Sequence, residues 1–155
     1  MKKRERKVHT MNIEEVRKFI LDYPTAKIYL GADSQRIKKK RVKFVVVVVV
    51  HYEGHCGAKV FYETSYDDIT DAKLSRPFNR MMKEVQLLTE LYTQLEDILW
   101  NRDFEIHIDV NPEKGTGSNV AYQAAKGVIW GMIGVEPVCK PEAWCASTVA
   151  DKYSK

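Results

Sequence analysis

The sequence predicts an α/β fold: a mixed five-stranded sheet, in which an antiparallel three-strand meander is followed by parallel strands, with flanking helices. Three observations predict it. Residues 27–64 contain three apolar runs separated by short polar turns, as in a meander. Residues 78–100 carry apolar side chains at helical spacing. Beyond them the chain alternates between strand-like and helix-like segments, which is typical of α/β proteins.

The first half of the chain predicts one helix and the meander. Residues 12–22 place apolar side chains at helical spacing behind Asn12, a preferred N-cap residue. The strands are expected at 27–33, 42–52 and 58–64. The second of them contains six consecutive valines, which predicts a strand that is buried on both faces.

The second half predicts alternating helices and strands. A helix at 78–100 presents an apolar stripe, a strand follows at 104–110, and a further helix spans 118–132. A short fifth strand is expected at 135–139, and Pro141 opens a final helical segment that runs to the chain end. This order of elements is that of a ribonuclease-H-like fold.

Length and composition limit the class of protein. The chain has 155 residues, of which 45% are apolar and 30% charged, as in one soluble folded domain. We expect a basic tail at 1–11 and a single domain at 12–155, because no repeat or linker interrupts the sequence. The longest apolar run, at 44–50, is too short to cross a membrane. No signal segment is visible and the three cysteines are too few for a disulfide framework, so we expect a cytoplasmic protein without a membrane partner.

Three aspartates stand where carboxylates are poor core material. Asp33 and Asp109 each end an apolar strand, and Asp151 lies in the final helical segment. A lone buried ion is costly, so these positions make sense if the strands lie side by side and the acids share divalent metal ions. Gly31 would leave room for a metal and a phosphate, whereas His107 is interpreted as a solvated or hydrogen-bonded residue. The plainer alternatives are a turn at Asp33 and a solvated chain end at Asp151.

The predicted helix at 78–100 offers candidates for a fourth acid. At about 100° per residue, Glu84 lines up with the apolar stripe that faces the sheet. Glu90 groups instead with the polar side of the helix. An acid on an apolar stripe needs a compensating group, and a metal ion provides one. We therefore choose Glu84 and keep Glu90 as the alternative.

The basic residues are bunched. The net charge of +4 arises from 25 basic and 21 acidic residues, with one basic cluster in the N-terminal tail and another directly after the Asp33 strand. Such clusters attract phosphate backbones, although a solvated tail and a charged hairpin tip have the same composition. The predicted nucleic-acid-binding residues are Arg36, Lys38, Lys39, Lys40, Arg41, Lys43, Lys140 and Lys152.

The candidate acids also define the kind of metal. Carboxylate oxygens suit hard ions, which predicts Mg²⁺ or Mn²⁺ as the cofactor. The group of His51, His55 and Cys56 fits no zinc-finger spacing. A Ser–His–Asp or Cys–His nucleophile has no local signature either.

Three stretches carry a family resemblance: residues 31–35 (Gly-Ala-Asp-Ser-Gln), residues 107–109 (His-Ile-Asp) with the glycine-containing loop after them, and residues 140–152. They resemble the YkuK-type family of ribonuclease-H-like proteins, over nearly the whole chain from about Asn12. The resemblance implies a ribonuclease H fold and a nuclease activity. It implies two metal ligands on adjacent strands, one acid on the long helix and one on the last helix: Asp33, Asp109, Glu84 and Asp151.

Together these observations predict a metal-dependent nuclease that hydrolyses phosphodiester bonds of RNA, DNA or a hybrid by a two-metal mechanism. The alternative is a non-catalytic nucleic-acid-binding or scaffold protein on the same fold, because fold does not fix function. A third option is a junction resolvase, which would need a homodimer with two sites.

Overall fold

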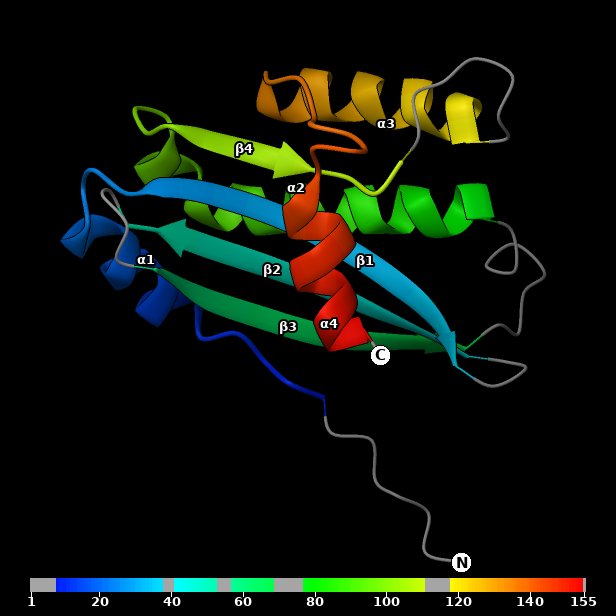
Figure 1. The fold of residues 1–155 in the computed structure, drawn as a ribbon, viewed down its shortest axis with the longest axis horizontal. Coiled ribbons are helices and arrows are strands. Elements are labelled where there is room, and N and C mark those ends of the chain that lie inside the picture. Colours follow the sequence, from blue (N-terminus) through cyan, green and yellow to red (C-terminus); the bar gives the residue numbers. More distant parts are fainter. Residues whose placement is uncertain (1–7, 38–40, 53–56, 69–76, 111–117, 155) are drawn as a thin grey trace, which may run out of the picture.

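One mixed sheet organises the molecule. The computed structural model describes residues 8–37, 41–52, 57–68, 77–110 and 118–154. Within this part of the chain the sheet has four strands in the order β3-β2-β1-β4 (Figure 1). The strands are β1 (Lys27–Ile37), β2 (Arg41–His51), β3 (Ala58–Asp68) and β4 (Phe104–His107). The helices are α1 (Ile13–Asp22), α2 (Pro77–Leu99), α3 (Ser118–Ile133), the π-helix η2 (Cys145–Ala150) and α4 (Asp151–Ser154).

The predicted meander is confirmed. Strands β1, β2 and β3 pair in antiparallel order, and β4 then pairs with β1 in parallel. Two strands are longer than expected, since β1 reaches Ile37 and β3 reaches Asp68. Their polar ends stay in the ladder because each has a partner on β2: Arg36 lies opposite Val42, and Asp68 opposite Arg41. Pairing with a neighbour therefore overrides the polar composition of these ends.

The predicted fifth strand at 135–139 is wrong as a strand. In the described part of the chain this segment forms only an isolated parallel bridge between His107 and Val138. Val138 donates to the carbonyl of Ile106 at 2.8 Å and accepts from the amide of Ile108 at 3.0 Å. The neighbouring Pro137 has no amide hydrogen with which to extend the ladder. The segment thus lies beside β4 without forming a full strand.

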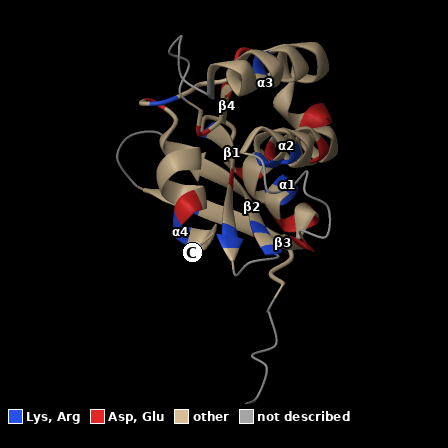
Figure 2. Cartoon of the chain, turned by 90° about the vertical axis from the view of Figure 1, so that its right-hand side faces the viewer, with Lys and Arg blue, Asp and Glu red and all other residues tan. Residues whose placement is uncertain are grey.

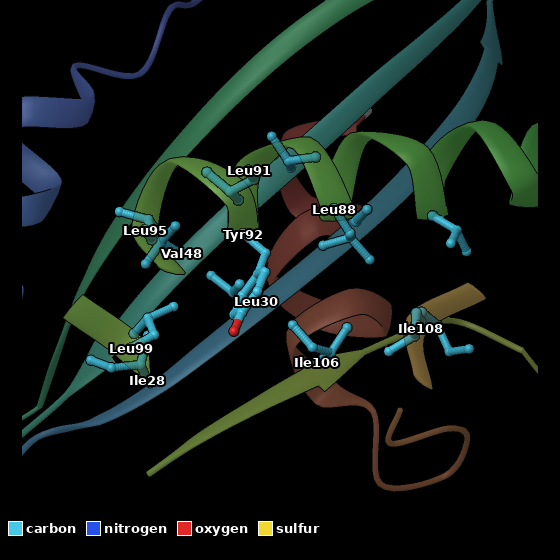
Figure 3. Close-up of a cluster of buried hydrophobic side chains, with 14 of the residues drawn as sticks. Ile28, Leu30, Val48, Leu88, Leu91, Tyr92, Leu95, Leu99, Ile106 and Ile108 are labelled. Atoms are coloured by element: carbon cyan, nitrogen blue, oxygen red, sulfur yellow. The ribbon is translucent and has the colours of Figure 1, made fainter. Parts of the chain in front are cut away.

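Helices cover both faces of the sheet and create two apolar layers. On one face α2 packs its stripe, including Leu88 and Leu95, against Ile28, Leu30 and Ile106 (Figure 3). On the other face η2 and α4 cover the alternate valines of β2. All six consecutive valines are buried, which confirms the prediction of a strand buried on both faces.

The end of the chain differs from the predicted helix that opens at Pro141. The amides of Glu142 and Ala143 both bond to the carbonyl of Cys139, which holds these residues in turns. Helical structure is continuous only from η2, which starts at Cys145. None of the helices described is long and apolar enough to cross a membrane.

Candidate functional site

The pairing of β1 with β4 brings two of the predicted acids together. In this parallel ladder Gly31 lies beside His107. Asp33 lies two residues after Gly31, and Asp109 lies two residues after His107. Neighbouring strands lie about 4.8 Å apart, with paired side chains on one face. Asp109 is past the end of β4, but its neighbour Ile108 is held by the hydrogen bond to Val138. Asp33 therefore lies beside the point where β4 ends, but it is inside β1, which continues to Ile37, so the prediction that Asp33 ends its strand is wrong.

Glu84 reaches this end of the sheet from α2. Its side chain is only 6% exposed, and the Ser34 hydroxyl donates to Oε2 at 2.9 Å. Burial, together with the negative charges of Asp33 and Asp109, raises the pKa of Glu84 to about 8, although the Ser34 hydrogen bond and Arg80 oppose the rise. By contrast, Glu90 is exposed and accepts from Gln86 on the same helix.

Asp33 is the second buried acid. Burial, together with the charges of Asp109 and Asp151, raises its pKa to about 6. The Ser154 hydroxyl, which donates to Oδ2 at 3.0 Å, and the Ser34 amide oppose this rise. Asp151 is the first residue of α4, so the C-terminal helix brings both the fourth acid and a hydrogen-bond donor to Asp33. Asp109 and Asp151 thus lie near enough for their charges to act on Asp33, and Asp33 and Asp109 near enough to act on Glu84.

Asp109 has a cationic neighbour. Lys140 Nζ lies 3.0 Å from its Oδ1 atom, and this ion pair lacks hydrogen-bond geometry, so the buried Oδ1 accepts no hydrogen bond. An all-oxygen set of partly buried acids suits a hard divalent cation in its chemistry. No three His, Cys, Asp or Glu side chains of the described chain stand close enough to form a ready metal site. The acids fit Mg²⁺ or Mn²⁺ by type, and their side chains would have to converge to bind it.

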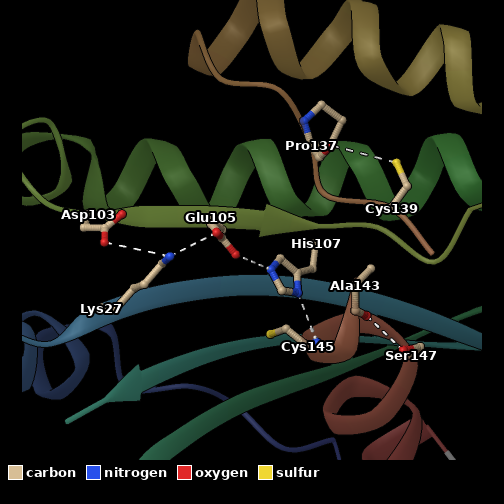
Figure 4. A network of polar contacts seen from close by, with 9 residues as sticks. All are labelled: Lys27, Asp103, Glu105, His107, Pro137, Cys139, Ala143, Cys145 and Ser147. Atoms are coloured by element: carbon tan, nitrogen blue, oxygen red, sulfur yellow. Dashed lines mark hydrogen bonds and ion pairs between the residues drawn. The ribbon is translucent and has the colours of Figure 1, made fainter. Parts of the chain in front are cut away.

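A second cluster on β1 and β4 holds the C-terminal helices in place (Figure 4). His107 is fully buried, and its Nδ1 accepts from the backbone amide of Cys145 at 3.2 Å. The ring proton therefore sits on Nε2, 2.8 Å from the carboxylate of Glu105, which also receives Lys27 Nζ at 3.0 Å. Burial lowers the pKa of His107, so the ring is neutral at pH 7. The sequence left open whether His107 is solvated or hydrogen-bonded; the structure shows that it is buried and hydrogen-bonded.

Gly31 has a different role from the one its sequence position indicates. A Cβ atom there would lie 2.9 Å from both the carbonyl carbon and the Sγ atom of Cys145, and 3.0 Å from the amide of Ala146. The space above Gly31 is therefore filled by η2, not open to a metal and a phosphate. Since η2 leads directly into Asp151, this close contact fixes how near the fourth acid comes to β1. π-helical turns are frequent at functional sites.

The predicted basic residues lie in different surroundings. Lys43 and Lys152 line one cavity beside α4, and Lys140 lies at Asp109. Arg36 is exposed at the end of β1, whereas Arg41 forms an ion pair with Asp68 at 2.7 Å. Outside the described residues are the first seven residues of the N-terminal tail and three of the predicted binding residues: Lys38, Lys39 and Lys40.

Sequence reasoning did not find the groups that support the acids. Ser34, Ser154 and Arg80 each act on an acid that lies at least four residues away along the chain. Ser34 directly follows Asp33 in the sequence, and strand alternation, which turns it to the α2 side, was the only available signal. Ser154 has no local signal, because its contact with Asp33 depends on how α4 packs.

Comparison with known proteins identifies one family. A family model described as ribonuclease H-like matches residues 11–155, which is nearly the whole chain. Neither the curated proteins nor the solved structures contain a match.

Proposed function

The chain belongs to the ribonuclease H-like family, and on this premise we propose that it is a metal-dependent nuclease that hydrolyses phosphodiester bonds. The observation that carries the proposal is the gathering of like charge. Asp33 lies within β1 and Asp109 just past the end of the neighbouring strand β4, and the charges of both raise the pKa of the buried Glu84. A fold keeps buried like charges together at a free-energy cost, and such clusters mark functional sites.

The proposed division of roles follows from the contacts. Asp33, Glu84, Asp109 and Asp151 would hold Mg²⁺ or Mn²⁺. When bound, such a pair of ions supplies an activated water and charge stabilisation for the leaving oxygen. Ser154 and Ser34 hold the carboxylates of Asp33 and Glu84 in position.

Lys140 balances Asp109 and stands beside it, where it would also attract a phosphate. Basic side chains near the acids would bind the backbone of the substrate, which implies recognition of backbone and shape over base sequence. The remaining candidate function is nucleic-acid binding without cleavage, in which the acids are not catalytic.

A cleavage panel tests the proposal. Labelled single-stranded and duplex RNA and DNA, a hybrid and a four-way junction are incubated with Mg²⁺, Mn²⁺ or EDTA. We expect metal-dependent cleavage by the wild type, and a loss of about 10³-fold or more in Asp33→Asn and Asp109→Asn, because each removes an interaction worth several kcal/mol in the transition state.

Two glutamates on α2 provide the matched control. Glu84→Gln should lose activity with the aspartate variants, whereas Glu90→Gln, an exposed position on the same helix, should retain it. An Asp33→Asn protein that cleaves as fast as the wild type would refute the proposed site. Binding with no cleavage of any substrate would favour the non-catalytic alternative.

A further inference from the structure

Three aromatic rings from distant parts of the chain form a continuous stack. Tyr62 of β3 lies 3.8 Å from the ring of His9 at an interplanar angle of 12°, and 4.1 Å from the ring of Tyr153 at 13°. Two rings so close and nearly parallel to Tyr62 must occupy its opposite faces. His9 is exposed, so the outer face of its ring ends the stack toward solvent.

The backbone fixes the position of His9. Its amide donates to Thr64 Oγ1 at 2.8 Å, and the Thr64 amide donates to the carbonyl of His9 at 2.9 Å. The ring Nδ1 lies 2.8 Å from the carbonyl of Tyr62. The aromatic stack is therefore anchored to β3 by three contacts.

Two lysines stand beside this stack. A cavity of about 440 Å³ is lined by His9, Tyr62 and Tyr153 together with Lys43 of β2 and Lys152 of α4. This volume lies in the range of about 300–1,000 Å³ that is usual for small-molecule sites. Within the described chain neither lysine forms an ion pair with a carboxylate, and Lys152 Nζ lies 5.6 Å from the centre of the Tyr153 ring. Figure 2 shows basic positions on α4 and on the strand ends next to it.

The cavity lies on the same side of the sheet as Asp33. Across the strands Asp33 is opposite Val45, and Val45 is opposite Thr64, a cavity-lining residue. Two strand spacings separate Asp33 from Thr64, or about 10 Å between backbones. The chain also connects the two places directly, because Asp151 is followed by Lys152 and Tyr153. A polynucleotide strand held at the acids would reach the cavity within a few nucleotides.

We propose that this cavity binds one nucleotide of a single-stranded segment of the substrate, with its phosphate between Lys43 and Lys152 and its base against the aromatic stack. Stacking on aromatic side chains combined with lysine contacts to the backbone is how proteins bind single strands without sequence preference. The inference rests on the proposed function, since it names the form of nucleic acid that the acidic site receives.

Binding in EDTA tests the subsite separately from cleavage. Fluorescence anisotropy measures the affinity of labelled ten-nucleotide oligo-dT and oligo-U for the full chain at several salt concentrations. We expect Lys43→Gln/Lys152→Gln to bind about tenfold more weakly, with a salt slope reduced by about 0.7, the value for one phosphate of a single strand. Lys152→Gln alone, at an exposed position, should show a smaller change in the same direction. The matched control is Lys18→Gln on α1, an exposed lysine on the other side of the sheet, which should leave both quantities unchanged.

Stacking has its own readout. A 2-aminopurine base in the oligonucleotide should be quenched on binding to the wild type and less quenched by His9→Ala, which removes the exposed end of the stack. Affinities of the lysine variants within twofold of the wild type, or quenching that His9→Ala leaves intact, would overturn the inference. Lysine-dependent binding without cleavage would keep the subsite and reject the nuclease, and cleavage without lysine-dependent binding would do the reverse.

Discussion

Two clusters of ionisable side chains, one on β1 and β4 and the other where β1 meets α2 and α4, respond to burial in opposite ways. At one end Lys27, Glu105 and His107 form a chain of contacts in which each charge meets a complementary group. Burial alone would raise the pKa of Glu105, but hydrogen bonds from His107 and Lys27 hold it below its ordinary value. At the other end Asp33 and Glu84 have raised pKa values, because burial and like charge act together.

This difference in charge compensation indicates that the two clusters have different roles. The paired cluster stabilises the fold and anchors η2, and it needs nothing from outside the chain. In the part of the chain that the structure describes, neither of the buried acids Asp33 and Glu84 forms an ion pair; Lys140 pairs with Asp109, and Arg80 only partly offsets the raised pKa of Glu84. An arrangement of buried acids without compensating charge persists where a ligand cation or a reaction requires it. The acidic end is thus the part of the molecule whose energetics point to a function.

We expect the strongest response in the stability of the metal-free protein when Glu84 is replaced by glutamine. The pKa of Glu84 is about 8 in the fold against an ordinary 4.5, so its contribution to stability is present below pH 4.5 and lost as the pH rises through 8. Glutamine cannot ionise and still accepts from Ser34. We expect Glu84→Gln to be more stable than the wild type at pH 8 in EDTA by on the order of 3 kcal/mol, and about equal at pH 4.

Urea unfolding across this pH range measures the effect. Glu90→Gln, exposed on the same helix, should change the free energy of unfolding by less than about 0.5 kcal/mol at any pH. Added Mg²⁺ should stabilise the wild type more than Glu84→Gln, because ligand binding to the folded state adds to its stability. Parallel curves for the wild type and Glu84→Gln would show that no charge strain is stored at the acidic end.

The next effect concerns the contact that joins the two clusters. Gly31→Ala places a Cβ atom 2.9 Å from Cys145, the residue whose amide His107 binds, and overpacking of this kind costs about 1–3 kcal/mol. Because η2 must move, cleavage should fall as well. Gly127→Ala on α3 is the control: its Cβ meets no atom within 4 Å, and alanine in a helix should stabilise the protein by up to about 1 kcal/mol. Equal stability of both variants would mean that η2 is not tightly seated on β1.

Much of the fold could be predicted because its signals are local. The apolar periodicity of α2 and the six valines of β2 each lie within one segment, and both predictions are confirmed. The predicted fifth strand failed because a strand needs a partner along its whole length, and β4 ends at His107. The final helix started later than Pro141 indicated, since hydrogen bonds to Cys139 define turns there.

The candidate site divides in the same way. Asp33 and Asp109 could be proposed from sequence because each follows an apolar run, although β1 continues past Asp33 to Ile37, and Glu84 because an acid interrupts an apolar stripe. The partners of these acids could not. Ser154 lies 121 residues from Asp33, and the aromatic stack joins residues 9, 62 and 153. Such contacts depend on tertiary packing, and no local pattern of residues indicates them.

The last prediction concerns the paired cluster of Lys27, Glu105 and His107, where the expected change in stability is small. Lys27 is one-third exposed, so Lys27→Met should lower the free energy of unfolding at pH 7 by at most about 1 kcal/mol. The informative quantity is the pKa of Glu105, measured by NMR titration, which should rise when the Lys27 hydrogen bond is lost. Since a lowered pKa gives stability above the ordinary value of 4.5 that is lost at lower pH, the difference between Lys27→Met and the wild type should shrink in acid.

Lys126→Met is the control for this last prediction, because its pair with Glu136 at 3.4 Å is more exposed and should contribute almost nothing. Cleavage should be unchanged in both variants, as neither lysine lies among the acids. If the pKa of Glu105 did not move, Lys27 would not compensate its charge, and the contrast with the acidic end would rest on His107 alone. A rise in that pKa without loss of activity would instead show that the two clusters have separate tasks: the paired cluster stabilises the fold, and the acidic cluster serves the cation.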